Sequence, residues 1–346
     1  MTHRLLRTLV AAVGFVAGHP AVATAQGAPA VRMSRAWPVM GTMFVATVWT
    51  RDSAAALPAL RAARDSVRLV DSLMSTYRAE SERSRVNGAA GTGVPVPVSS
   101  HTMHVLRRAR LYWQLSGGAF DPTVGPIVMA WGFEGSTVRR PSRHELDSLR
   151  ALVGFGTVRL DSIAGTVALP RTGMRLDLGG IAKGYALDLA RRALTDAAID
   201  GGTVDLGGNV LVFGHPPSGG RWQVAIVDPL RPRATIGTLE LDSGAVATSG
   251  NYEHYVVIGG KRYGHLVDPR TGRPKRSVLS ATAVGPAGEW SDGLSATLYL
   301  VGPTRGRAIV DSIPGLAGVW VLDRGQHRVR ARDVVTSARA RFLTKA

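Results

Sequence analysis

The segment Arg175–Asp188, RLDLGGIAKGYALD, constrains the fold more than any other part of this 346-residue chain. The alternation Leu-Asp-Leu at residues 176–178 predicts the end of a β-strand. A tight turn follows at Gly179-Gly180, and apolar residues recur at helical spacing from Ile181 onward. A strand that enters a helix through glycines presents backbone amides and a helix N-terminus to an anion. The alternative is an ordinary strand–turn–helix corner that carries a surface lysine, Lys183.

The N-terminal 25 residues have the three parts of a secretory signal peptide. A basic start with two arginines precedes a short apolar run at Leu9–Ala17, and Ala23-Thr24-Ala25 is an A-x-A-type cleavage site. The apolar run is too short to span a bilayer. We therefore expect removal of residues 1–25 and export to the periplasm. A loose linker is expected at residues 26–35, followed by one folded unit at residues 36–346.

The chain contains no cysteine and has a formal net charge of +17. Without cysteine there is neither a disulfide nor a lipid anchor on a Cys, so the core alone must stabilise the exported protein. Only 4 of the 42 basic residues are Lys, and the arginines are scattered rather than gathered in one stripe. We therefore expect no nucleic-acid partner, and an anionic small substrate fits the charge equally well.

Helix and strand patterns follow one another irregularly along the chain. Helical spacing predicts a helix from Leu60 to Met74 and another from Ser99 or Ser100 to Gly117. Apolar runs bounded by turns predict strands at residues 37–49, 201–214, 222–229, 235–241, 280–284 and 319–322, with a hairpin at Gly259-Gly260. The polar segment Tyr77–Asn87 is typical of a solvated loop. Because the strands outnumber the helices without regular βαβ alternation, we expect an α+β fold with mixed or antiparallel sheets and flanking helices.

Several polar residues fall at predicted strand ends or glycine turns, where pocket residues commonly gather. They are Asp177, Lys183, Asp205, His265, Asp268 and Asp292. Oxygen ligands without Cys or paired His favour a hard cation, first of all Mg²⁺. Ser295 follows Asp292 by one helical turn, so the two could share one metal ion. The alternatives are an N-cap for Asp292, an interior histidine for His265 and a turn carboxylate for Asp205.

Eight motifs, in order over roughly residues 36–305, resemble the ApbE family of FAD:protein FMN transferases. They are MGTMF at Met40, YRAESERSRVN at Tyr77, GGAFDPTVGP at Gly117, LDLGGIAKGYALD at Leu176, GGTVDLGGN at Gly201, ATSGNYE at Ala247, HLVDPRTGRP at His265 and SDGLSATLYLVG at Ser291. The resemblance implies an ApbE-like catalytic unit that binds FAD and uses Mg²⁺. Such an enzyme moves FMN to a Thr hydroxyl of a target flavoprotein, with membrane-associated proteins among the candidate targets, and releases AMP.

The resemblance also assigns roles to individual residues. It places flavin contacts on Met40, Tyr77, Ala119, Phe120, Asp121, Asp177, Lys183 and Val267. His265 is the expected base for the incoming hydroxyl, and its ordinary pKa suits that task. The implied metal ligands are the Gly180 carbonyl, Asp292 and the position four residues after Asp292.

The chain departs from the family at that last position. The family pattern reads D-x-x-S-T or D-x-x-D-T, but Ala296 stands where Thr is expected and Thr297 comes one residue late. One residue turns a helical side chain by about 100°, so we expect Thr297 to miss the metal and Ser295 or a water to replace it. Two alternatives to the transferase stay open: an FAD pyrophosphatase that forms FMN and AMP, and a non-catalytic FAD-binding protein.

Overall fold

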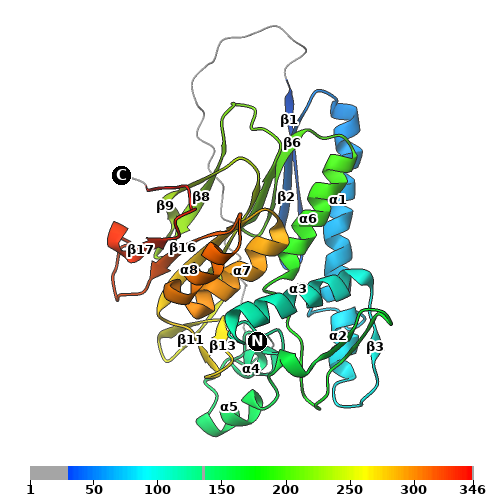
Figure 1. Ribbon diagram of the computed structural model, residues 1–346, viewed down its shortest axis with the longest axis vertical. Helices are drawn as coiled ribbons and strands as arrows, with labels where there is room; N and C mark the ends of the chain where they lie inside the picture. The colour runs from blue at the N-terminus through cyan, green and yellow to red at the C-terminus, as the bar shows by residue number, and fades with distance from the viewer. Residues whose placement is uncertain (1–29, 135–136, 345–346) are drawn as a thin grey trace, which may run out of the picture.

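An antiparallel sheet of eight strands forms the centre of the computed structural model, which describes residues 30–134 and 137–344. The strands are β1 (Val31–Val39), β2 (Thr42–Thr50), β6 (Gly201–Leu206), β7 (Asn209–Phe213), β10 (Gly244–Gly250), β15 (Val278–Gly285), β16 (Ala317–Leu322) and β17 (Val334–Thr336). They lie in the order β1-β2-β6-β7-β10-β15-β16-β17, and every neighbouring pair is antiparallel (Figure 1). The expected α+β class is confirmed, with the antiparallel form of the sheet.

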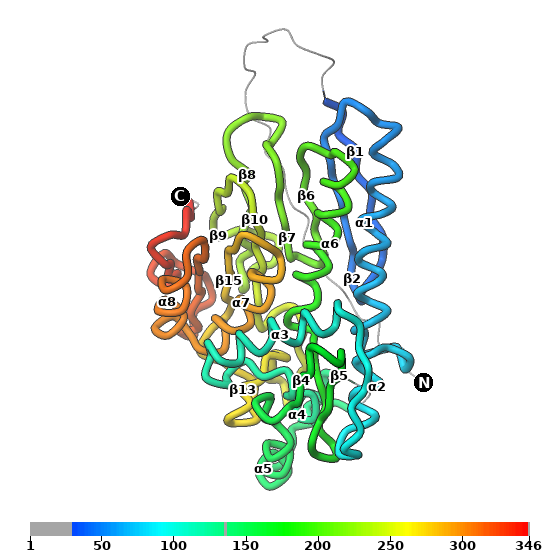
Figure 2. The backbone as a smooth tube through the Cα atoms, turned by 45° about the vertical axis from the view of Figure 1, so that its right-hand side comes forward, coloured from blue at the N-terminus to red at the C-terminus, as the bar shows by residue number. Residues whose placement is uncertain are grey.

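Helices cover one face of this sheet and form the main core with it. They are α1 (Ser53–Met74), α6 (Ala182–Asp196), α7 (Gly288–Val301) and α8 (Pro303–Ser312). The predicted stripe from Leu60 to Met74 is buried on α1, whose first amides are capped by Asp52. Figure 2 shows α1 and α6 side by side along the sheet edge that holds β1, β2 and β6.

A smaller sheet covers the opposite face. Its strands are β8 (Trp222–Asp228), β9 (Arg231–Leu241) and β18 (Phe342–Thr344), in the order β18-β9-β8. Val210 and Val212 of β7 pack against this smaller sheet, whereas Leu211 and Phe213 pack into the helical core. Both faces of β7 are therefore buried, which explains its continuous apolar run.

A group of short elements lies across one end of the sheet, next to the N-termini of α6 and α7 (Figures 1 and 2). The helices of this group are α2 (Glu82–Gly88), α3 (Ser100–Ser116), α4 (Gly125–Ala130), α5 (Arg143–Arg150) and a 3₁₀ turn at Phe155–Thr157. A second 3₁₀ turn, Ala331–Asp333, lies apart from the group and leads into β17. The strands are β3 (Val96–Pro97), β4 (Arg159–Asp161), β5 (Thr166–Ala168), β11 (Tyr255–Ile258), β12 (Lys261–Gly264), β13 (Val267–Asp268) and β14 (Arg273–Pro274). The hairpin expected at Gly259-Gly260 is the β11–β12 pair.

Four local expectations were wrong. The single strand expected at residues 201–214 is a hairpin, because Gly207 and Gly208 turn the chain between β6 and β7. Residues 31–35, expected in the linker, belong to β1, because they pair with residues 46–50 of β2. The strand expected at residues 37–49 is a hairpin that turns at Met40 and Gly41, both with positive φ (51° and 70°). The segment expected as a solvated loop contains α2, where Arg83 is only 1% exposed. The expected signal peptide, residues 1–25, lies outside the described residues.

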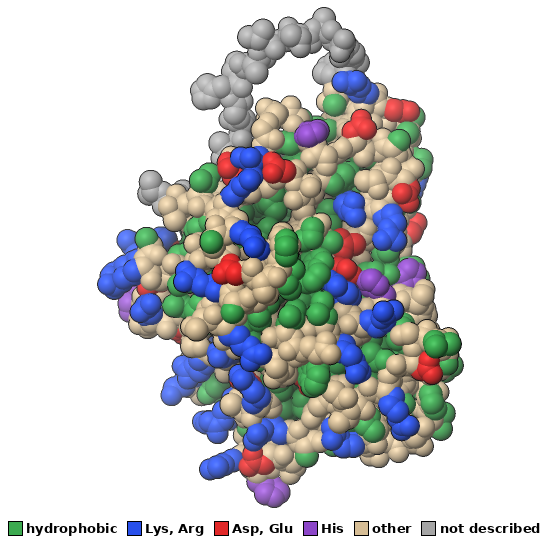
Figure 3. Space-filling model, viewed as in Figure 1, with side chains coloured by type: hydrophobic (Ala, Val, Ile, Leu, Met, Phe, Trp, Pro, Cys, Tyr) green, Lys and Arg blue, Asp and Glu red, His purple; other side chains and the backbone are tan. Residues whose placement is uncertain are grey.

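Lys and Arg side chains are distributed over most of the face shown in Figure 3, and acidic side chains are fewer there. In the part of the chain that the structure describes, no helix combines the length and the apolar character needed to cross a membrane.

Candidate active site

The residues that precede the Gly179-Gly180 turn are not a strand. The Leu176 carbonyl accepts hydrogen bonds from Arg83 Nε (2.7 Å) and Asn87 Nδ2 (3.1 Å). The Leu176 amide donates to Asn87 Oδ1 (2.7 Å). Side chains of α2 thus take the place of a neighbouring strand, and the expected strand end at residues 176–178 is corrected to an extended loop.

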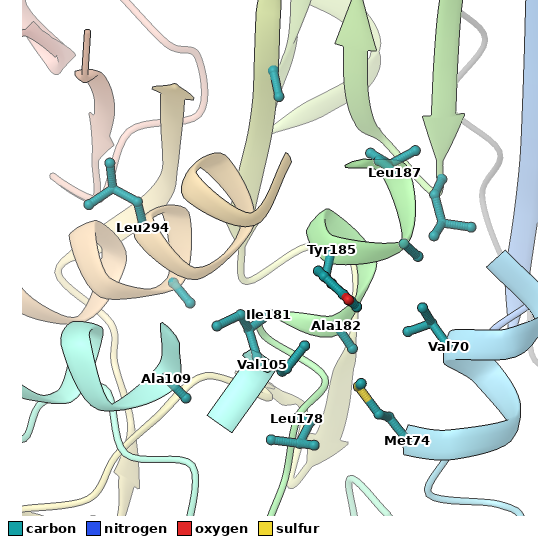
Figure 4. Close-up of a cluster of buried hydrophobic side chains, with 14 of the residues drawn as sticks. Val70, Met74, Val105, Ala109, Leu178, Ile181, Ala182, Tyr185, Leu187 and Leu294 are labelled. Atoms are coloured by element: carbon teal, nitrogen blue, oxygen red, sulfur yellow. The ribbon is translucent and has the colours of Figure 1, made fainter. Parts of the chain in front are cut away.

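Apolar side chains from several helices pack against the residues that flank the Gly179-Gly180 turn. Figure 4 shows Leu178, Ile181 and Ala182 packed among Val70 and Met74 of α1 and residues of α3. The amides of Ile181 and Ala182 both donate to the Leu178 carbonyl (3.1 and 3.0 Å). These contacts and hydrogen bonds hold the backbone in place at the start of α6.

Asp292 is the acceptor for the first turn of α6. Its Oδ2 accepts the Gly184 amide (2.8 Å), and its Oδ1 accepts Asn209 Nδ2 (2.8 Å). Asp292 does not cap its own helix, as one expectation had it, because α7 already begins at Gly288. Burial raises the pKa of Asp292, while Lys183 and these hydrogen bonds act in the opposite direction.

Lys183 is half-buried on α6 and its positive charge acts on five titratable groups. They are Asp205, Glu253, His254, His265 and Asp292. Burial raises the pKa of Asp205 to about 6, although the Gly208 amide and Lys183 favour its charged form. Solvent reaches Glu253, yet the protein around it and the charge of Asp292 raise its pKa to about 7. Four chain segments thus converge on one lysine.

His265 lies between β12 and β13, with its ring edge-on to His254 at a centroid distance of 5.3 Å. Its Nδ1 lies 3.1 Å from the His254 carbonyl oxygen. Because a carbonyl only accepts, Nδ1 carries the proton of the neutral ring and Nε2 keeps a free lone pair. His265 is half-buried, and the protein around it, the neighbouring His254 and Lys183 lower its pKa to about 4, so the ring is neutral at pH 7.

The sequence and the fold that hold this cluster match a known protein family. The model of the ApbE family matches residues 40–320. The chain belongs to the ApbE family. An FAD:protein FMN transferase of Vibrio cholerae is 33% identical over 290 residues, covering 82% of this chain and 86% of the relative. One from Treponema pallidum is 31% identical and covers 90% of both chains.

Solved structures of ApbE proteins have the same fold. The crystal structure of the ApbE protein of Thermotoga maritima matches with a TM-score of 0.80 and 31% identity, covering 89% of this chain and 97% of that one. The flavin transferase ApbE of Vibrio cholerae matches with a TM-score of 0.77 and 28% identity, covering 90% and 98%.

The ApbE resemblance places metal ligands on the turn and on α7, and these two elements touch. A Cβ added to Gly180 would lie 3.7 Å from the Cβ of Ala296 and 3.4 Å from the Phe120 ring. Ala296 is 3% exposed, so the departure from the family pattern faces the turn itself. Thr297 Oγ1 donates to the Gly293 carbonyl (2.8 Å), so its hydroxyl is committed to its own helix.

Neutral oxygens lie next to the Asp292 carboxylate. Ser295 donates to the Asp292 carbonyl (2.8 Å) and lies 2.9 Å from the Ser249 hydroxyl. Within the described ranges, no three His, Cys, Asp or Glu side chains gather as a metal site. One carboxylate with carbonyl and hydroxyl oxygens fits Mg²⁺, which keeps several waters and often binds substrate phosphates.

The flavin contacts expected from the ApbE resemblance lie in different environments. Ala119 and Phe120 are buried, and Met40 packs half-buried against the same core. Tyr77 is 84% exposed beyond the end of α1. Val267 packs in a separate small core with Trp131.

Two expected carboxylates already hold backbone groups. Asp121 accepts the amides of Thr123 (2.8 Å) and Phe155 (3.0 Å), so it organises its own loop. Asp177 accepts the Gly179 amide (2.8 Å) and is half-buried. Asp268, to which the resemblance assigns no ligand role, forms an ion pair with Arg270 (2.7 Å).

Four residues that shape the site had no role assigned from the sequence. Asn209 holds Asp292, Asp188 holds the start of α7, and Glu253 and His254 lie around Lys183. Three of them lie inside motifs that carried the resemblance: GGTVDLGGN, LDLGGIAKGYALD and ATSGNYE. Their polar side chains within glycine-rich motifs were the available signal.

Proposed function

We propose that this chain is an FAD:protein FMN transferase that moves FMN from FAD to a Thr hydroxyl of an acceptor protein and releases AMP. The observation that carries the proposal is the convergence of Lys183, Asp292 and neutral His265 beside a glycine turn. In the reaction, the hydroxyl oxygen forms a bond to the FMN phosphorus, and the bond from that phosphorus to the oxygen of AMP breaks.

Each of these side chains has a task in that displacement. His265 Nε2 accepts the proton of the hydroxyl, since its lone pair is free and Nδ1 is anchored. Lys183 offsets the charge of the pyrophosphate, and glycine at positions 179 and 180 leaves room for its oxygens. We propose that Asp292, the Gly180 carbonyl and Ser295 hold Mg²⁺, which would neutralise charge on the phosphates when bound.

The direct test incubates the chain with FAD and MgCl₂, with and without a Thr-bearing FMN-binding acceptor domain. Intact-mass measurement should show a flavin-sized mass increase on the acceptor and none on its Thr→Ala variant. Free FMN and AMP without acceptor modification would indicate an FAD pyrophosphatase. Unchanged bound FAD would indicate a binding protein, which the missing Thr at Ala296 favours as the second candidate.

The pH profile should report the low pKa of His265. A base acts when unprotonated, so a pKa of about 4 keeps His265 active well below its ordinary pKa of 6.5. The kcat/KM for FAD should therefore show no His265-dependent decrease near pH 6.5. It should decrease as the pH falls through 4–5. Circular dichroism at each pH verifies the fold, and a His265-dependent limb at 6.5 would contradict this expectation.

Ala296→Thr should tighten Mg²⁺ binding. The new hydroxyl would lie one turn beyond Asp292 and beside Gly180. One added interaction of ~0.5–1.5 kcal/mol predicts roughly a 2–10-fold lower Mg²⁺ concentration for half-maximal turnover. An unchanged Mg²⁺ dependence with a lower melting temperature would show that position 296 only packs the core.

We propose export to the periplasm from the features of residues 1–25. Expression of the full chain in a Gram-negative host should give a periplasmic protein that begins near Gln26. N-terminal mass analysis of the fractionated protein measures this, and an intact Met1 species confined to the cytoplasm would refute export.

A further inference from the structure

Helices α6 and α7 hold each other through a reciprocal pair of hydrogen bonds. Gly184 and Asp188 on α6 repeat the spacing of Gly288 and Asp292 on α7, so both helices carry the pattern G-x-x-x-D. The Gly184 amide donates to Asp292 Oδ2 (2.8 Å). The Gly288 amide donates to Asp188 Oδ1 (2.7 Å). Each aspartate therefore caps the first turn of the other helix.

Neither helix has a cap of its own. No side chain at the Ncap position of α6 or α7 accepts a hydrogen bond from its first turn. Unpaired first-turn amides are costly when buried, and a carboxylate also interacts favourably with the positive end of a helix dipole. Asp188 meets this need at α7 with both oxygens, because Oδ2 also accepts the Glu289 amide (2.8 Å).

The two helices cross so closely that neither crossing glycine has room for a Cβ. A Cβ on Gly184 would lie 2.1 Å from the Gly288 carbonyl oxygen, and a Cβ on Gly288 would lie 2.3 Å from the Gly184 carbonyl oxygen. This contact sets the distance between the two helices. The two carboxylates set the position of each helix along the axis of the other.

The two aspartates differ in the groups that they bind. Asp188 uses both oxygens on the α7 backbone and is 7% exposed. Asp292 accepts the Gly184 amide with one oxygen and the Asn209 side chain with the other, in the field of Lys183. Both carboxylates accept one hydrogen bond on each oxygen, but only Asp188 spends both on the backbone of α7, whereas Asp292 faces a side chain and the charge of Lys183.

We infer that Asp188 is a positioning residue that sets the place of Asp292 by clamping the N-terminus of α7. This inference rests on the proposed role of Asp292 in holding Mg²⁺. Asp188 caps Gly288, and Asp292 stands one turn further along the same helix. A shift of that first turn therefore moves the Asp292 carboxylate relative to the glycine turn and Lys183.

The test uses Asp188→Asn in the full chain with FAD bound. Asn can cap one amide with its oxygen, but its NH₂ group replaces the second oxygen and faces the other amide, which is also a donor. We expect kcat to fall and the Mg²⁺ dissociation constant, measured by titration calorimetry, to rise roughly 10–100-fold. FAD affinity, followed by flavin fluorescence, should change less than threefold. The matched control Asp196→Asn removes one charge from the exposed end of α6, and it should leave kcat, the Mg²⁺ dissociation constant and the FAD affinity unchanged.

A double-mutant cycle with Asp292→Asn separates positioning from a general structural role. If Asp188 acts through Asp292, Asp188→Asn should cause little further loss of Mg²⁺ affinity in the Asp292→Asn background. Equal losses in both backgrounds, or an unchanged Mg²⁺ affinity in the single variant, would overturn the inference. Should Asp188→Asn fail to fold, Asp188→Ser keeps one acceptor and serves in the same cycle. A wild-type chain that binds Mg²⁺ but transfers no FMN would refute the proposed function and leave this test intact.

Discussion

Asp292→Asn is expected to reduce FAD turnover at least about 100-fold without unfolding the chain, since even residues behind a metal ligand typically contribute 10–100-fold. The substitution keeps the shape of the side chain. The new Oδ1 accepts the Gly184 amide, and the Asn209 side chain can flip so that its oxygen accepts the new amide. Only the negative charge is removed from the site.

The melting temperature distinguishes this loss from damage to the fold. Burial raises the pKa of Asp292, so its charge costs folding free energy and its removal should leave stability unchanged or higher. Turnover is measured as AMP release at saturating and at limiting Mg²⁺, with Asp196→Asn as the control. Full activity at limiting Mg²⁺ would show that Asp292 does not hold the ion. A melting temperature lower by more than about 8 °C would assign the loss of turnover to damage of the fold and contradict the expectation of unchanged stability.

Elements whose signals are local could be predicted from the sequence. The stripe from Leu60 to Met74 gave α1, and Ser99 with Gly117 marked the two ends of α3. The glycine pair at residues 259–260 forms the expected hairpin turn. In each case the residues that determine the element lie within it, so periodicity and capping chemistry suffice.

Elements whose backbone groups are satisfied by distant residues could not be predicted. Residues 176–178 alternate as a strand does, but Asn87 is 89 positions away and takes the hydrogen bonds that a neighbouring strand would make. Asp292 resembled an N-cap because the partner of the first α7 amide, Asp188, is 100 positions away. No local pattern records such partners.

The site residues show the same division. Motif positions located Lys183, His265 and Asp292, which the structure brings to one place. Their chemical state depends on the fold: the ordinary pKa suggested a titrating His265, whereas burial beside His254 keeps it neutral. The resemblance supplied the positions, and the packing supplies the protonation.

Gly184→Ala is expected to destabilise the chain by ~1–3 kcal/mol and to reduce turnover with it. In a helix this change normally stabilises by ~0.5–1 kcal/mol, so a loss would reverse the usual sign. The reason is steric, because the new Cβ would lie 2.1 Å from the Gly288 carbonyl oxygen and 2.6 Å from the Asp292 Cβ. Both are fixed parts of α7, so the helices must separate and move Asp292 away from the turn.

The matched control is Gly88→Ala at the end of α2, where an added Cβ meets nothing within 4 Å. Urea unfolding should give this variant an unchanged or slightly higher free energy of unfolding, while Gly184→Ala shows a lower midpoint with the same slope. Gly288→Ala should match Gly184→Ala, since its Cβ would lie 2.3 Å from the Gly184 carbonyl oxygen. Stable and active alanine variants at both crossing glycines would mean that the helices do not cross at backbone contact. The placement of Asp292 would then need another cause.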